Sequence, residues 1–225
     1  EGVAGGGAPP PEPPAAGPPR TGADGSGPGP TGSAVADPAA PAPVGPVRPG
    51  LAPDPPDGAA TGWAGLLFLL ATAAEAGLPD RALDEPALAA RPLPWTLHAA
   101  ALALVPGIAP ADPAALALAG LGPDRAAGLL RAAAPTSRER DAVGALAAGW
   151  ARATAARLGD GPYADGPAGA VLAVARRPGR ITAETGWIEA VLAVADTDPE
   201  VRRAGLDLDP GWLGWLGAVV RYRYV

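Results

Sequence analysis

Proline and glycine supply half of the first sixty residues, seventeen and thirteen positions respectively, and this constrains the fold more than any other feature. Proline removes a backbone hydrogen-bond donor, and glycine raises the entropic cost of ordering the chain. The segment also holds almost no large apolar side chains that a core could bury. We therefore expect residues 1–60 to be a disordered linker, with polyproline II character in runs such as residues 9–11. The alternative is a ligand for a proline-recognising domain.

From Thr61 onward, large apolar side chains become frequent and recur at helical spacing in several segments. Thr61 is a candidate N-cap for the first helix. Thr136 and Glu139 have the spacing of a capping box at the start of the most clearly predicted helix, residues 136–158. The predicted helices cover residues 62–74, 94–105, 112–118, 136–158 and 168–175, and the last of these segments could instead be a strand.

Beyond residue 177, β-branched and aromatic residues replace the helical pattern. Strands are predicted at residues 180–184, 187–194 and 218–225, with a turn at 185–186 and a short helix at 198–204. Helices first and strands last indicate an α+β architecture rather than alternating α/β. We expect one domain over residues 61–225, helical over 61–177, whose β-rich part over 178–225 forms a small antiparallel sheet.

Composition excludes several classes of function. The chain has no cysteine and a single histidine, which excludes disulfides, a cysteine nucleophile and the usual zinc ligand sets. The net charge is −6, and residues 1–60 hold six acids and two arginines, so the rest is close to neutral. A nearly neutral domain without a basic cluster argues against a nucleic-acid partner and favours protein partners.

The absence of lysine, asparagine, glutamine and methionine points to the codon bias of a high-GC bacterium. Since not even position 1 is methionine, we expect a fragment or a processed product. The apolar run over residues 62–74 spans thirteen residues, whereas a membrane helix needs about 20. It lacks the basic flank of a secretory signal, so we expect a buried core helix in a cytoplasmic protein.

No catalytic motif is found, and we expect no cofactor. His98 lies in an apolar helical segment without a serine or acid nearby in sequence, so a packed histidine is the simpler interpretation. Asp207 and Asp209 could hold a cation or act as acid and base. A calcium loop would need further ligands, however, so Asp209 is expected to accept backbone N–H groups at the turn before Pro210.

The chain contains six tryptophans but only one phenylalanine. Trp212 and Trp215 are three residues apart in a glycine-framed segment, and one helical turn would align them. They are the candidate partner contact, since tryptophan dominates interface hot spots. The alternative, favoured by packing, is that both indoles belong to the core.

Residues 64–70 and 201–212, with the tyrosine-rich end of the chain, resemble proteins of high-GC bacteria that accompany phage-tail-like contractile injection systems. Some of those proteins are described as tape-measure-like. The resemblance spans residues 61–225, and Gly214 stands where the family pattern has a proline. It implies a non-catalytic structural or assembly component that joins an injection particle through protein–protein contacts. The alternative is a small-molecule-binding or enzymatic domain whose site the sequence does not reveal.

If residues 1–60 contribute nothing to the core, deleting them should leave the melting temperature of the domain unchanged within a few degrees. Circular dichroism melts of the full and shortened chains measure this. A larger drop would show that the segment helps the domain to fold.

Overall fold

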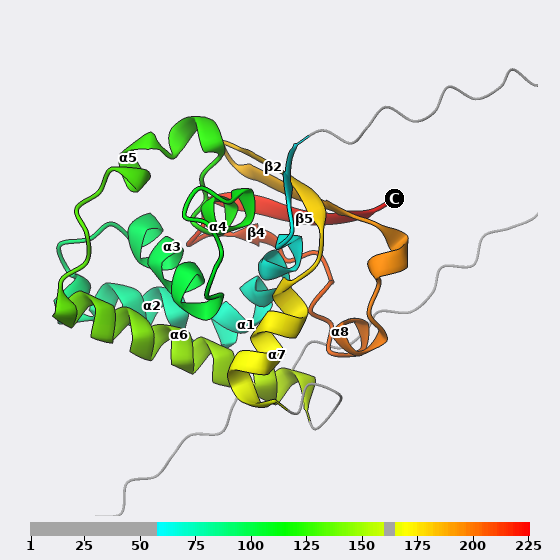
Figure 1. Cartoon of the computed structure of the whole chain (residues 1–225), viewed down its shortest axis with the longest axis horizontal. Helices are drawn as coiled ribbons and strands as arrows, with labels where there is room; N and C mark the ends of the chain where they lie inside the picture. The colour runs from blue at the N-terminus through cyan, green and yellow to red at the C-terminus, as the bar shows by residue number, and fades with distance from the viewer. Residues whose placement is uncertain (1–57, 160–164) are drawn as a thin grey trace, which may run out of the picture. The chain divides into compact units, whose positions relative to one another are not determined.

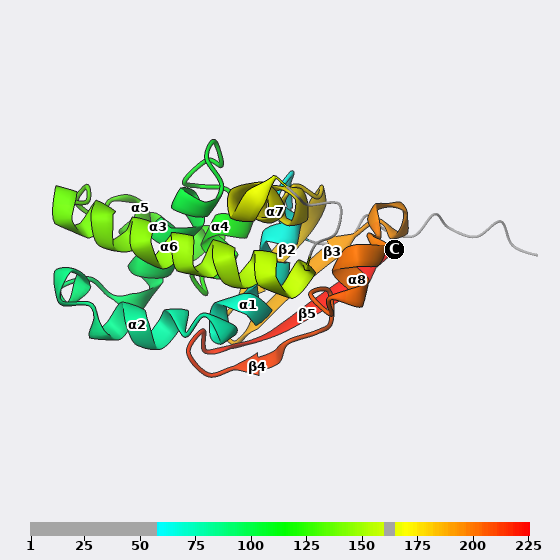
Figure 2. The same cartoon turned by 90° about the horizontal axis from the view of Figure 1, so that it is seen from below.

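A five-stranded mixed sheet organises the fold, and most helices lie on one side of it (Figures 1 and 2). The computed structural model describes residues 58–159 and 165–225. The predicted disordered linker lies outside these ranges apart from its last three positions. Two of those positions, Ala59 and Ala60, belong to the first strand, so the sheet begins earlier in the chain than the composition indicated.

Across the sheet the strands follow the order β1-β2-β3-β5-β4. β2 and β3 form the predicted hairpin, with its turn at Thr185 and Gly186. The expectation of a purely antiparallel sheet is wrong, because β3 and β5 run parallel. Over residues 193–217 the chain crosses back along the sheet before β5 begins, and parallel pairing requires such a crossover. The strands are β1 Ala59–Thr61, β2 Gly179–Glu184, β3 Trp187–Leu192, β4 Gly211–Leu213 and β5 Ala218–Tyr224.

Helices occupy most of the chain between β1 and β2, which confirms the predominantly helical α+β class. The predicted capping box is present at the start of α6. The Thr136 hydroxyl accepts a hydrogen bond from the backbone of Glu139, whose carboxylate accepts one from the backbone of Thr136. The α-helices are α1 Leu70–Glu75, α2 Leu78–Asp84, α3 Leu93–Leu104, α4 Pro113–Leu118, α5 Ala127–Leu130, α6 Ser137–Leu158, α7 Gly166–Ala175 and α8 Pro199–Arg203. The 3-10 turns are η1 Ala64–Leu69, η2 Pro86–Leu88, η3 Pro123–Arg125 and η4 Val194–Asp196.

The first apolar segment is not the single capped helix that the sequence predicted. Thr61 ends β1, and its hydroxyl donates to Asp112 (2.8 Å) instead of capping a helix. The segment then forms η1 followed by α1, and every residue of η1 is buried. At Gly65 an added Cβ would lie 2.1 Å from the Val174 carbonyl oxygen, so only glycine permits this approach of η1 to α7. Trp63 is half-buried beside the core.

The core expectation for this segment is confirmed at Leu67, which is fully buried. Within residues 58–159 and 165–225, no helix is both long enough and apolar enough to cross a membrane.

Buried polar contacts fix η1 between α6 and the sheet. The indole nitrogen Nε1 of Trp150 donates to the Leu69 carbonyl (2.9 Å) and lies 3.1 Å from the Thr72 hydroxyl. On the other side, the Tyr222 hydroxyl donates to the Leu67 carbonyl (2.6 Å). Each carbonyl also has a local donor, the Leu70 N–H for Leu67 and the Thr72 hydroxyl for Leu69 (3.0 Å), so the donors from Trp150 and Tyr222 add second hydrogen bonds that tie η1 to α6 and β5.

Tyr222→Phe should destabilise the domain by about 0.5–1.5 kcal/mol, because it removes one of the two hydrogen bonds to the buried Leu67 carbonyl, which keeps the Leu70 N–H, while the ring stays in place. Urea unfolding measures the loss as a lower midpoint with an unchanged slope. An unchanged midpoint would show that this hydrogen bond contributes nothing net to the fold.

Candidate functional site

His98 lies on α3 and is only 7% exposed, as expected of a packed histidine. Its Nε2 lies 2.8 Å from the Pro110 carbonyl oxygen. Because a carbonyl oxygen only accepts, Nε2 carries the proton. Burial lowers the pKa of this imidazole, so the ring is neutral at pH 7. No described residue pairs with His98 as a nucleophile or as an orienting acid.

The two aspartates have structural partners. Asp207 is buried, and its Oδ2 accepts from Arg202 Nε (2.6 Å) and from the Tyr224 hydroxyl (3.1 Å). Asp209 accepts the backbone N–H of Tyr222 (2.7 Å), so it does bind a backbone donor, but across the sheet rather than within its own turn. Among the described residues, no group of three or more potential ligands could hold a metal ion.

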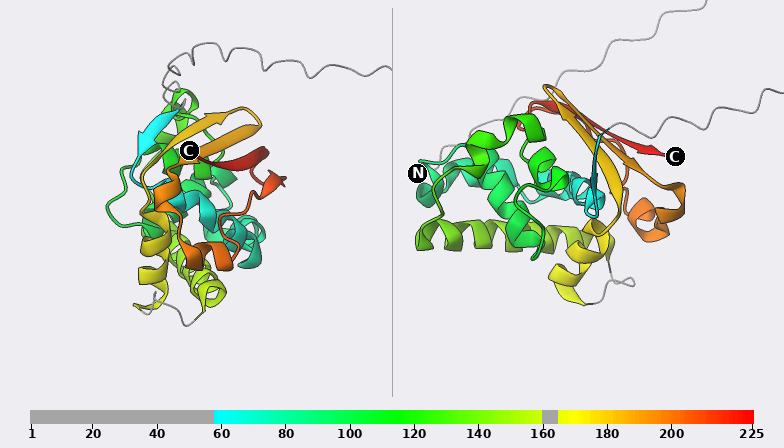
Figure 3. Two further views of the ribbon diagram at one scale, coloured as in Figure 1. Left: turned by 90° about the vertical axis from the view of Figure 1, so that its right-hand side faces the viewer. Right: turned by 45° about the horizontal axis from the view of Figure 1, so that its top comes forward.

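Trp212 and Trp215 do not share a helical turn. Trp212 lies on the edge strand β4, beside β5 (Figure 3), and is 64% exposed, so the core interpretation is wrong for this residue. Trp215 lies in the following turn and packs partly against the core. The glycines allow this turn rather than a helix, with Gly217 at a φ of 66°. The candidate pair therefore splits into one exposed and one packed indole.

The sheet register brings a third tryptophan, which the sequence analysis did not single out, into line with Trp212. Val219 of β5 pairs with Trp187 of β3 on one side and with Trp212 of β4 on the other. Paired residues share a face, so the three side chains form one row, which we call the tryptophan row. With strands about 4.8 Å apart, the row extends about 10 Å across the sheet. Trp187 is 36% exposed, so both ends of the row are accessible.

Two arginines beside the tryptophan row lie close to carboxylates, whereas Glu184 of β2, in register with Trp187, is exposed and forms no ion pair with a described residue. The Arg221 guanidinium lies 5.9 Å from the centre of the Trp187 ring, and its Nε is 3.5 Å from an Asp209 oxygen. Two residues further along β5, Arg223 lies 3.4 Å from Glu189. The row therefore has two ion pairs along its border and one unpaired carboxylate, that of Glu184, at its Trp187 end.

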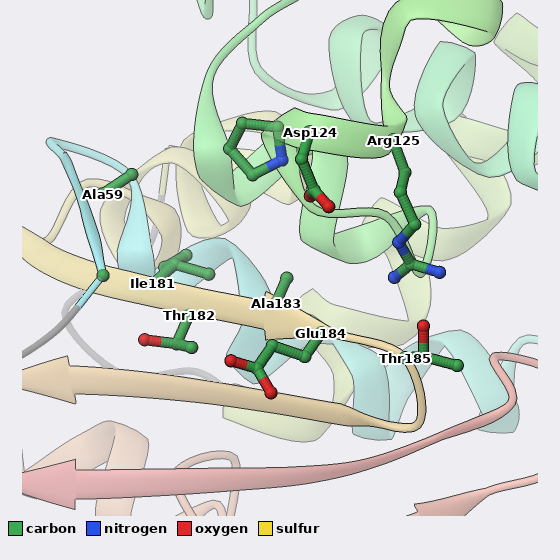
Figure 4. A pocket seen from close by; sticks show the side chains of 10 residues that line it. Ala59, Asp124, Arg125, Ile181, Thr182, Ala183, Glu184 and Thr185 are labelled. Atoms are coloured by element: carbon green, nitrogen blue, oxygen red, sulfur yellow. The ribbon is translucent and has the colours of Figure 1, made fainter.

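A hollow of about 640 Å³ lies at the edge of β2 (Figure 4). The side chains of Ile181 and Ala183 point toward η3, whereas Thr182 and Glu184 point to the opposite side of the strand. Asp124 approaches from η3, so its carboxylate and that of Glu184 lie on different sides of β2. They are not arranged as an acid–base pair.

A second hollow, of about 360 Å³, lies between α3 and the start of α6 and is lined mostly by apolar side chains. We call it the His98 groove. Trp95 forms part of its wall, and the Arg91 guanidinium lies 4.2 Å from the centre of the Trp95 ring. Arg91 is held there by Glu139, which accepts hydrogen bonds from its Nε (2.6 Å) and Nη2 (3.1 Å).

No protein-family model, curated protein or solved structure matches this chain. Two accessible apolar surfaces of the described residues, the tryptophan row and the His98 groove, are the candidate binding sites.

The Arg91–Glu139 pair predicts a pH-dependent stability. The hydrogen bond from Arg91, together with the one from the Thr136 backbone, lowers the pKa of Glu139 from 4.5 to about 2. A carboxylate whose pKa is lower in the folded state than in the unfolded state stabilises the protein at pH values above the unfolded-state pKa. This stabilisation is lost as the pH falls toward the folded-state pKa. The difference in unfolding free energy between wild type and Glu139→Gln should be constant above pH 5 and shrink from about pH 4.5 to 2.

Chemical denaturation of both proteins across this pH range measures that difference. A difference that stayed constant down to pH 2 would contradict a stabilising role for the ionised Glu139.

Proposed function

We propose that this domain is a non-catalytic protein-binding component of a contractile injection particle, and that it binds through the tryptophan row. The exposure of Trp212, in line with Val219 and Trp187, is the observation that carries this proposal. The resemblance of residues 64–70 and 201–212 to proteins of injection systems supports the class of partner.

The chemistry of the row supports a protein partner. Tryptophan and arginine are enriched at interface hot spots, and the row combines two indoles with Arg221 at its border. Two of the border charges are paired within the chain, and the exposed Glu184 beside Trp187 favours a partner that offers a basic group at that end of the row. Burying Trp212 and Trp187 against another protein would remove a large apolar area from water.

A second candidate function, binding of a small molecule, is favoured by the His98 groove, which is a separate surface formed by α3 and α6.

Trp212→Ala should weaken binding to the particle by at least 2 kcal/mol, roughly 30-fold in the dissociation constant, because it removes an exposed indole from the contact. The test uses a strain that lacks this gene and is complemented with wild-type or variant protein. Co-sedimentation of the protein with purified particles, and the number of particles counted by electron microscopy, are the two measurements.

Leu83→Ala is the matched control, because Leu83 on α2 is also 64% exposed but lies away from the sheet. It should bind as wild type does. Normal co-sedimentation of Trp212→Ala would exclude the tryptophan row as the contact. Normal particles in the deletion strain, with no co-sedimentation of the wild-type protein, would exclude the particle role itself.

A further inference from the structure

The His98 groove has the size and lining of a small-molecule site. Its volume of about 360 Å³ lies at the low end of the range for ligand pockets, roughly 300–1,000 Å³. Trp95, His98 and Leu102 recur at helical spacing and line one wall from α3, together with two alanines. Val143 of α6 and Pro135 contribute further apolar surface.

His98 supplies a hydrogen-bond acceptor at this groove. Since its Nε2–H donates to Pro110, the neutral ring keeps a lone pair on Nδ1, and no described residue donates to that atom. The fully enclosed polar side-chain atoms without a partner are Arg180 Nε and Asp207 Oδ1, within the part of the chain that the structure describes. His98 Nδ1 is not among them, so this atom keeps some contact with solvent, and the ring that carries it lines the groove.

Arg140 supplies a cation at the same groove. It is exposed, and its Nη1 donates to the Pro135 carbonyl (2.6 Å), which holds the guanidinium beside the apolar lining. Arg140 forms no ion pair with a described residue, because the neighbouring Glu139 is engaged by Arg91 and by the Thr136 backbone. The charge of Arg140 therefore remains available to an anion.

We propose that the His98 groove binds a small aromatic carboxylate that also carries a hydroxyl group. The aromatic ring lies against the lining formed by Trp95, Leu102 and Val143. The hydroxyl donates to His98 Nδ1, and the carboxylate pairs with the Arg140 guanidinium, which suits carboxylates geometrically. An apolar body with one donor and one negative charge matches the groove's apolar walls, one acceptor and one cation.

The site is independent of the tryptophan row, since the groove lies between α3 and α6 and the row lies on the sheet. Failure of either proposal therefore leaves the other standing. Ligand binding should be identical in wild type and Trp212→Ala.

The experiment titrates the full chain with three probes and follows binding by ligand-observed NMR. The probes are 4-hydroxyphenylacetate, phenylacetate, which lacks the hydroxyl, and 4-hydroxyphenylacetamide, which lacks the charge. We expect 4-hydroxyphenylacetate to bind most tightly, with each of the other two weaker by at least threefold. Arg140→Gln should weaken the acid probe by at least threefold and leave the affinity for the amide probe unchanged.

Blocking the groove provides a control that does not depend on the buried histidine. Ala103 is exposed on α3 and lines the groove, so Ala103→Trp should fill it and abolish binding while the circular dichroism melt stays as in wild type. Ala148→Trp, an exposed position on α6 outside the lining, should bind as wild type does.

Three outcomes would overturn the proposal. The first is no saturable binding of 4-hydroxyphenylacetate to the wild-type chain. The second is equal binding to the Ala103→Trp and Ala148→Trp variants. The third is binding of a tyrosine-terminated peptide with none of the three small probes, which would assign the groove to a protein partner instead.

Discussion

The burial of η1 between α6 and the sheet is the constraint on which the rest of the domain depends. A 3-10 turn with no exposed residue carries backbone carbonyls into the core, and each needs a donor there. Trp150 and Tyr222 provide donors from opposite sides, so α6 and β5 are positioned by the same short segment. Gly65 allows the backbone of α7 to pack directly against η1, because glycine has no Cβ at this position. These contacts tie the packing of the helices to the packing of the sheet through one segment.

Local signals in the sequence predicted the elements that local chemistry controls. The capping box of Thr136 and Glu139, the Thr185–Gly186 turn and the β-branched and aromatic residues of β5 all gave the correct element type. Thr61 was misread, because an N-cap and a strand end can carry the same residue. Its hydroxyl binds Asp112, a residue 51 positions away, and no local pattern reports such a contact. The parallel pairing of β3 and β5 was missed for the same reason, since it depends on a crossover and not on composition.

In the candidate site, too, local features could be predicted from the sequence and features that depend on long-range packing could not. Trp212 was identified from composition, but its exposure could not be predicted. It lies on β4, a strand of three residues that is too short to show an alternation of apolar and polar side chains. Trp187 could have been found, because the predicted strand places it on the same face as the charged Glu189, two residues along. Its alignment with Trp212 required the register of three strands. The His98 groove likewise required the packing of α6 against α3, although the helical spacing of Trp95, His98 and Leu102 was visible in the sequence.

The position of β5 has a consequence for biosynthesis. This strand lies between β3 and β4, yet it is the last of the five to leave the ribosome. Tyr222 reaches back to Leu67, which is made 155 residues earlier. The apolar η1 segment therefore waits without its sheet partner through nearly the whole synthesis of the domain, and such non-local contacts form slowly. Until β5 is made, part of the apolar surface that η1 buries in the folded domain lacks its cover, and transiently exposed surface of this kind favours aggregation during folding.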